Sequence, residues 1–432
     1  MLRATLILLS GGALAQVLPL LLGPAITRLF SPQAMGVFTA FSTVAATVAV
    51  VACARYEYAL PLVRSPAQAA ALLALCLRIW LAVALLSVAL ALALHALWRW
   101  PLAWMLPLAV ASSGLLQLLM MWSNRAGRFK ALAVSRVIQY GGAALLQLLF
   151  GWLLWTGTPA AHDGAWLLAA GAVLAALLAL APLLRPAPVG GWRALWPPAG
   201  GNAALPAAMR QQARAHRDFP LLNTPHAFLG TLQDALAVAL LMACSGEAAA
   251  GFWGLALRYL KAPATLVGTA VSQALYPRLT QSDARAARRA VRQVMAVLGV
   301  LGLALGLALY LAAPSLFAWV FGERWRAAGE LAGALSPYIA THFVAAPLAV
   351  VTMAWRAQRW AFRLALAGQV VFLAALAWGL LGDGGSLLRG AWAVSAGMTL
   401  YFGYYFWRLA FWPLPAGQAG AAAASAKDNG PP

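Results

Sequence analysis

Residues 67–94 read AQAAALLALCLRIWLAVALLSVALALAL, an unbroken apolar run in which Arg78 is the only charged side chain. An α-helix rises 1.5 Å per residue and the hydrocarbon core of a bilayer is about 30 Å thick, so about 20 residues are enough to cross it. The sequence therefore predicts a membrane-spanning helix over residues 67–94.

Apolar runs of spanning length also lie on both sides of this segment, and 63% of the chain is hydrophobic. These further runs are 5–26, 37–54, 101–122, 131–155, 164–184, 221–244, 250–276, 293–320, 331–354, 361–381 and 387–411. Only helices and closed barrels satisfy their backbone hydrogen bonds in lipid. The pattern predicts an all-α polytopic membrane protein with about twelve transmembrane helices.

The formal net charge of +20 would indicate a nucleic-acid partner in a soluble chain. Here most Lys and Arg residues fall in alternate connections between the apolar runs, and the opposite connections contain few. Those few are Arg28, Arg99, Arg324, Arg326 and Arg389. The positive-inside rule then places the basic connections and both termini in the cytoplasm. Because topology accounts for the charge, we expect the lipid bilayer to be a partner and nucleic acid not to be one.

The longest hydrophilic connection lies near the middle of the chain and separates six runs from six. We expect a six-helix bundle over 1–184, a basic cytoplasmic linker over 185–219 with a short surface helix at 207–217, a second six-helix bundle over 220–412, and a disordered cytoplasmic tail over 413–432.

The two halves share short matching segments. Ala34 to Phe38 resembles Ala249 to Trp253, and Ala59-Leu60 matches Ala274-Leu275 at the same offset along the sequence. A common offset of half the chain indicates an internal duplication. With six spans in each half, the pseudo-two-fold axis would run along the membrane normal.

Ionisable residues inside apolar spans are costly and usually face a bundle interior or an aqueous cavity. Arg258, Lys261, Thr265 and Ser272 are spaced to lie near one face of the helix at 250–276. We interpret Arg258, Lys261 and Arg78 as a cationic site for a ligand that carries phosphate. The alternative for Arg258 is a structural ion pair with Asp234, at a similar depth in the preceding span.

Further polar residues are candidates for the cavity lining or for coupling to an ion gradient. The expected lining residues are Asn223, His226, Gln233, Thr265, Ser272 and His342. Asp234 and His226 are the candidates for ion coupling, although ordinary packing is the better explanation for either histidine, His226 or His342, taken alone. Arg55 and Glu57, which follow the second span, form either a cytoplasmic gate or an ion pair that orders the connection.

Catalytic motifs and metal-ligand spacings do not occur in the sequence. It has no HExxH, GxSxG or Walker A motif, and the three cysteines do not form a CxxC pair. We therefore expect a protein that is not an enzyme and that needs no cofactor or metal.

Three segments resemble the oligosaccharide flippase (Wzx-type) family of bacterial lipopolysaccharide and polysaccharide biosynthesis proteins. They are Arg55-Tyr56-Glu57-Tyr58-Ala59-Leu60-Pro61-Leu62, then Asp218-Phe219-Pro220 with Asn223-Thr224-Pro225, and finally Leu257-Arg258 through Ser272-Gln273-Ala274 with Tyr276-Pro277-Arg278. The resemblance extends over residues 1–410. It implies membership of the multidrug/oligosaccharidyl-lipid/polysaccharide (MOP) exporter superfamily, with two six-helix bundles around a central cavity as in MATE transporters.

The resemblance also implies a function, location and partners. The expected function is alternating-access movement of undecaprenyl-pyrophosphate-linked oligosaccharide units, the precursors of O-antigen, capsule or exopolysaccharide, across the bacterial inner membrane. Expected partners are the polyprenyl-linked oligosaccharide and the proteins of glycan polymerisation and export. One alternative is a cation-coupled drug antiporter of the same superfamily, and a second is a membrane glycan polymerase or ligase. Glu57 and Asp163 are the two acidic residues of the first bundle, and this small number favours an anionic, lipid-linked substrate.

Overall fold

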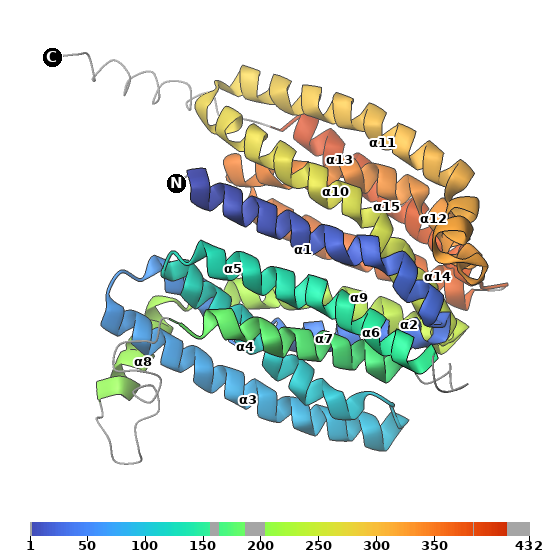
Figure 1. The fold of residues 1–432 in the computed structure, drawn as a ribbon. Helices are drawn as coiled ribbons and strands as arrows, with labels where there is room; N and C mark the ends of the chain where they lie inside the picture. Colours follow the sequence, from blue (N-terminus) through green and yellow to red (C-terminus); the bar gives the residue numbers. More distant parts are fainter. Residues whose placement is uncertain (1, 156–163, 186–203, 383, 413–432) are drawn as a thin grey trace. The chain divides into compact units, whose positions relative to one another are not determined.

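The computed structural model describes residues 2–155, 164–185, 204–382 and 384–412, and all regular elements in these ranges are helices (Figure 1). Clustering of contacts divides the chain into a first unit, Met1–Met242, and a second unit, Ala243–Pro432. The predicted all-α architecture is confirmed.

The described part of the first unit contains a series of α-helices joined by several short segments. The α-helices are α1 (Leu2–Leu29), α2 (Pro32–Ala49), α3 (Pro66–Trp98), α4 (Leu106–Arg125), α5 (Phe129–Arg136), α6 (Ala143–Trp155), α7 (Ala165–Leu180), α8 (Ala204–Ala215) and α9 (Thr224–Ser245). The short segments include the 3₁₀ helices η1 (Tyr56–Leu62), η2 (Ala103–Met105) and η4 (Ala181–Leu183), and the π-helices η3 (Val137–Gly142) and η6 (Phe219–Asn223).

The second unit contains the remaining helices. They are α10 (Glu247–Gln281), α11 (Ala284–Phe321), the 3₁₀ helix η7 (Glu323–Trp325), α12 (Arg326–Ala334), α13 (Ser336–Ala354), α14 (Gln358–Leu381) and α15 (Leu387–Ala410). Each of the twelve predicted spans corresponds to a helix, with α5, η3 and α6 together forming the fifth.

Within the described ranges, nine helical segments are long and apolar enough to cross a membrane. The predicted spans outside that set correspond to α2, α10 and α15. Helix α10 contains the charged residues Arg258 and Lys261, and α15 contains several tyrosines, which lowers their hydropathy. The sequence-based number of about twelve spans is consistent with these helices.

Short capping residues determine where several helices begin. Ser31 precedes α2 and its Oγ accepts a hydrogen bond from the Ala34 N–H, while Pro32 occupies the first helical position. Asp283 caps α11 in the same way at 2.6 Å, and Ser386 caps α15. Each cap satisfies one backbone N–H that the first helical turn leaves without an intrahelical partner.

The duplication is also visible in the positions of the elements along the chain. Helix α2 begins at Pro32 and α10 at Glu247, which is the offset of the two sequence matches. A left-handed residue precedes the fifth helix of each half, Gly127 at φ 67° before α5 and Arg356 at φ 52° before α14. The same turn geometry therefore recurs at equivalent places in the two halves.

Small residues allow close helix packing inside each unit. In the second unit, a Cβ atom on Gly302 would lie 2.7 Å from the Ala340 carbonyl oxygen, and one on Gly379 would lie 2.5 Å from the Cα of Gly390. Helix α11 thus approaches α13, and α14 approaches α15, at distances that only glycine permits. In the first unit, Gln147 of α6 donates to the Leu168 carbonyl of α7 at 3.0 Å.

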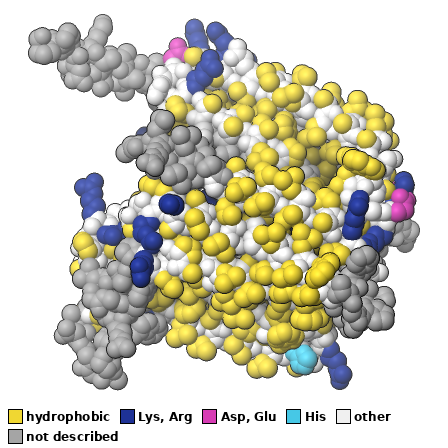
Figure 2. All heavy atoms as spheres, in the orientation of Figure 1, with side chains coloured by type: hydrophobic (Ala, Val, Ile, Leu, Met, Phe, Trp, Pro, Cys, Tyr) yellow, Lys and Arg dark blue, Asp and Glu magenta, His cyan; other side chains and the backbone are white. Residues whose placement is uncertain are grey.

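The surface is apolar along the middle of the helices. Leu303 and Val300 on α11 are 72% and 71% exposed, too much for a core position and as expected for contact with lipid. Figure 2 shows hydrophobic side chains along the helices and Lys and Arg side chains toward their ends. Together with the span lengths, this describes a multi-pass membrane protein.

The connection between the halves contains the predicted surface helix. Helix α8 spans Ala204–Ala215, so it begins slightly before the expected start at 207, and it packs against α3. The rest of the linker at 186–203 and the predicted tail at 413–432 lie outside the described residues. Contact clustering groups α9 with the first unit, whereas the sequence places it in the second bundle, so the division into two six-helix bundles stays a prediction.

Candidate functional site

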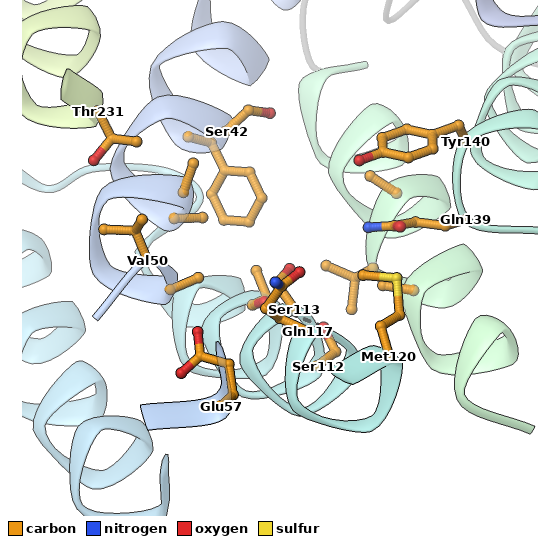
Figure 3. A pocket seen from close by; sticks show the side chains of 18 of the residues that line it. Ser42, Val50, Glu57, Ser112, Ser113, Gln117, Met120, Gln139, Tyr140 and Thr231 are labelled. Carbon is orange, nitrogen blue, oxygen red and sulfur yellow. Dashed lines mark hydrogen bonds between the residues drawn. The ribbon is translucent and has the colours of Figure 1, made fainter. Parts of the chain in front are cut away.

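A cavity of about 500 Å³ opens within the first unit, and we call it the N-unit cavity (Figure 3). Helices α2, α4, α7 and α9 and the short segments η1 and η3 contribute its walls, together with Arg55 just before η1. Its polar lining residues are Ser42, Arg55, Glu57, Tyr58, Ser112, Ser113, Gln117, Gln139, Tyr140 and Thr231. In Figure 3, Glu57 enters from η1, Gln139 and Tyr140 enter from η3 on the opposite side, and Gln117 lies between them.

A backbone turn after α2 directs Arg55 and Glu57. Ala54 and Arg55 have φ values of 47° and 61°, a left-handed conformation that costs a residue with a Cβ roughly 1 kcal/mol. After this turn the Arg55 guanidinium lies 4.9 Å from the centre of the Tyr58 ring, and Glu57 points into the cavity. After the left-handed pair, Arg55 thus lies over the Tyr58 ring and Glu57 lies at the wall of the cavity.

Glu57 is a buried carboxyl group with an open acceptor. The residue is 3% exposed, and its Oε2 has no hydrogen-bond partner among the described residues. Burial raises the pKa of Glu57 to about 7, because its own backbone N–H and the Arg55 charge offset only part of the desolvation. Among the described residues, Arg55 Nε is likewise buried without a partner.

The segment that contains Glu57 is held in place on both sides. The Tyr56 hydroxyl donates to the Ala213 carbonyl of α8 at 3.2 Å. At the far end of η1, Arg125 of α4 donates to the carbonyls of Val63 and Arg64, both at 3.1 Å. The three side chains of the Arg-Tyr-Glu motif therefore have different neighbours. Arg55 contacts Tyr58, Tyr56 contacts α8, and Glu57 faces the cavity.

The facing wall carries amide and phenol groups. Gln117 Nε2 donates to the Tyr58 hydroxyl at 2.9 Å. Gln139 and Tyr140 come from η3, where the wider π-helical turn interrupts the predicted fifth span. Gln139 Oε1 is buried without a hydrogen-bond partner among the described residues. The cavity thus presents donors and acceptors from several elements to one space.

The predicted polar stripe in the second unit lies on α10 as expected. Ser272 Oγ donates to the Pro347 carbonyl of α13 at 3.0 Å, and Thr265 Oγ1 donates to the Lys261 carbonyl at 3.0 Å. Lys261 is near enough to His342 of α13 for an electrostatic interaction. The structure therefore brings Lys261, His342 and Ser272 to one pair of helices.

The surroundings of His342 are aromatic. Its ring centre lies 5.8 Å from that of Tyr338 and 6.1 Å from that of Phe402, and its Nδ1 has no hydrogen-bond partner among the described residues. Arg258, one turn before Lys261 on α10, is exposed. A cation and a histidine beside aromatic rings can bind a ligand that has both anionic and apolar parts.

The other predicted site residues lie elsewhere. Arg78 donates from Nη1 to the Met209 sulfur of α8 at 2.7 Å and does not line the N-unit cavity. Asn223, His226 and Asp234 are exposed and Gln233 is half-buried, all in η6 or α9 and none in that cavity. An ion pair of Asp234 with Arg258 would join the two units and stays a prediction.

Several residues of the N-unit cavity were not predicted. The uncharged lining residues predicted from the sequence, Asn223, Gln233, Thr265 and Ser272, all lie in the second half of the chain, whereas Gln117, Gln139, Ser112 and Ser113 lie in the first half. A search for amide and hydroxyl side chains in otherwise apolar runs would have identified them, because Ser112, Ser113 and Gln117 lie within about a turn and a half of one span.

Comparisons with known proteins give a family match and a fold. Residues 207–330, from α8 into α12, match the family described as polysaccharide biosynthesis protein. The lipid II flippase MurJ in its inward closed conformation has a similar structure, with a TM-score of 0.69 at 10% identity over 98% of this chain and 93% of that chain.

A multidrug resistance MATE family transporter of the MOP superfamily, in an inward-facing conformation, gives a TM-score of 0.68 at 13% identity over 96% of each chain. No curated protein sequence matches the chain significantly. At these identities the solved structures establish the fold alone.

Proposed function

Since the chain resembles the polysaccharide biosynthesis proteins of the MOP superfamily, we propose that it is a flippase for undecaprenyl-pyrophosphate-linked oligosaccharide units. It moves these precursors of O-antigen, capsule or exopolysaccharide from the cytoplasmic to the periplasmic leaflet of the bacterial inner membrane, with both of its termini in the cytoplasm.

The observation that carries this proposal is the pair of basic residues Arg258 and Lys261 on α10, which we call the cationic stripe. Arg258 and Lys261 lie inside the segment that matches the polysaccharide biosynthesis family, on a helix long enough to cross the membrane. Charged groups at membrane depth usually mark a ligand or ion pathway. Arg and Lys replace the water that a pyrophosphate loses on entering a protein site, and charge-assisted hydrogen bonds to phosphate are among the strongest.

The proposed mechanism is alternating access. Arg258 and Lys261 bind the pyrophosphate, while polar side chains, including His342 and Ser272, accompany the glycan and the polyprenyl tail stays in lipid. Arg55 and Glu57 act at the cytoplasmic side as a gate. Asp234 and His226 are the residues we propose for coupling to an ion gradient.

A drug antiporter has the same fold, as the MATE match illustrates. The family match to polysaccharide biosynthesis proteins favours the lipid-linked substrate instead.

The test is the amount and sidedness of undecaprenyl-linked oligosaccharide in cells with and without the protein. We expect loss of the protein to trap the lipid-linked oligosaccharide on the cytoplasmic leaflet and to abolish the surface polysaccharide. The proposal would be contradicted if deletion of the protein, in a strain that makes this glycan, left the amount and sidedness of the undecaprenyl-linked oligosaccharide unchanged.

A further inference from the structure

The N-unit cavity combines polar groups without an excess of either charge. Among its described lining residues, Arg55 is the only cation and Glu57 the only anion, and the other polar groups are amides, hydroxyls and phenols. Three buried atoms that belong to this lining have no hydrogen-bond partner in the part of the chain that the structure describes: Glu57 Oε2, Gln139 Oε1 and Arg55 Nε. Buried polar atoms are nearly always hydrogen-bonded, so we expect each of these three side chains to gain a hydrogen-bond partner.

We propose that the N-unit cavity is a binding subsite for the sugar part of the carried molecule, an uncharged ligand segment rich in hydroxyl groups. This inference rests on the proposed flippase function and adds a subsite separate from the cationic stripe of α10.

The chemistry of the lining fits hydroxyl groups better than other ligands. A hydroxyl donates one hydrogen bond and accepts others, so sugar hydroxyls match a lining of carboxylate, amide, hydroxyl and phenol groups such as those of Glu57, Gln117 and Gln139. A phosphate would meet the Glu57 carboxylate at close range, and a purely apolar compound would leave these polar groups without a partner.

The walls also suit the faces of a sugar ring. Tyr58 and Tyr140 supply aromatic surface beside the polar groups, and Ala109, Ala172 and Ala176 leave room between the helices. The cavity volume of about 500 Å³ lies within the 300–1,000 Å³ typical of small-molecule sites. It therefore suits a short piece of glycan, while the rest of an oligosaccharide extends out of it.

Glu57 fixes where the sugar binds. The group is more than nine-tenths buried and aimed into the cavity from η1, opposite Gln139 of η3. The bonds from Tyr56 to α8 and from Arg125 to the end of η1 hold this side chain in position before a ligand arrives. A preformed acceptor of this kind gives specificity for ligands with donors at matching positions.

The experiment uses the full chain in lipid nanodiscs and three probes. The first is the lipid-linked oligosaccharide extracted from the host cells, the second is the free oligosaccharide released from it by mild acid, and the third is undecaprenyl pyrophosphate without sugar. The variants are Gln139→Leu and Gln117→Leu, with Gln68→Leu on the exposed face of α3 as the matched control. Ligand-induced shifts of the melting temperature give the apparent affinities.

We expect the free oligosaccharide to stabilise the wild type and Gln68→Leu, and its apparent affinity to fall at least tenfold in Gln139→Leu and Gln117→Leu. Binding of undecaprenyl pyrophosphate should change by less than twofold in all variants. Equal binding of the free oligosaccharide to all four proteins, or binding of the lipid-linked form without any effect of the two cavity variants, would overturn the subsite and leave the flippase function standing.

Failure of the lipid-linked oligosaccharide to bind any of the proteins would overturn the proposed function itself. A second measurement covers the case in which a cavity variant does not fold. A photoreactive amino acid in place of Met120, which lines the cavity, should crosslink to the free oligosaccharide, and the same group in place of Gln68 should not. Crosslinking from neither position means that water alone fills the cavity and overturns the subsite.

Discussion

The hydroxyl of Tyr56 donates a hydrogen bond to the carbonyl oxygen of Ala213, far along the chain from it. Tyr56 is the first residue of η1, and Ala213 stands in α8, the surface helix of the linker. This bond connects the linker to the segment that presents Glu57 at the wall of the N-unit cavity.

Replacing Tyr56 with Phe removes this bond while it keeps the ring. We expect a loss of about 1 kcal/mol in stability, the usual value for one hydrogen bond, and a melting temperature lower by a few degrees. Tyr276→Phe is the control, because Tyr276 is exposed on α10. Equal melting temperatures of Tyr56→Phe and the wild type would show that the bond contributes nothing.

The Glu57 carboxyl should make stability depend on pH. Its pKa in the folded protein is about 7, above the ordinary value of 4.5, so the folded state holds a proton that the unfolded state has released between those values. The contribution of Glu57 to stability is therefore fully present below pH 4.5 and decreases as the pH rises to 7, by about 3 kcal/mol at roughly 1.4 kcal/mol for each pH unit.

Glu57→Gln is the variant that checks this dependence. The amide does not ionise, so we expect the variant to match the wild type near pH 5 and to melt at a higher temperature at pH 8. Melting curves across this range measure the effect. A wild-type profile that is as flat as that of Glu57→Gln would contradict a buried, titrating carboxyl.

The contact between α11 and α13 should not tolerate a methyl group at Gly302. A Cβ there would lie 2.7 Å from the backbone oxygen of Ala340, which cannot move independently of its helix. We expect Gly302→Ala to cost about 1–3 kcal/mol through overpacking. Gly299→Ala, one turn earlier on the same helix with nothing within 4 Å, should be neutral or slightly stabilising. Thermal unfolding of the two variants in parallel decides the point.

The cationic stripe should be essential for transport. We expect Lys261→Glu and Arg258→Glu to reduce surface polysaccharide at least tenfold at normal protein levels, because one lost charge-assisted hydrogen bond already costs about 1.5–3 kcal/mol. Lys261→Arg should retain most of the activity. Arg285→Glu, an exposed cation of α11, is the control. Wild-type amounts of surface glycan in both charge-reversal variants would contradict a role of the cationic stripe in pyrophosphate binding.

Long apolar runs were enough to predict the helices. The run at 67–94 became α3 within a few residues, because a long apolar segment has one stable conformation in a bilayer. Gly302 and Gly306 had the spacing of a close helix contact, but only the structure shows which helix they approach.

The N-unit cavity was not predictable in the same way. Its lining comes from elements that are scattered along the chain from Phe41 to Thr231, and periodicity within one run says nothing about which runs meet. Arg78 illustrates the same limit, since its position in a span was correct and its neighbour, Met209 of α8, lies in the linker.

The π-helical turn η3 sets the alignment of everything that follows it in its span. Its wider turn already holds about one residue more than an α-helical turn, so one further residue inserted within Val137–Gly142 would rotate α6 by about 100° about its axis. Gln147 would then turn away from the Leu168 carbonyl, and α6 would present another face to α7. The number of residues in η3 is therefore constrained in addition to their identity.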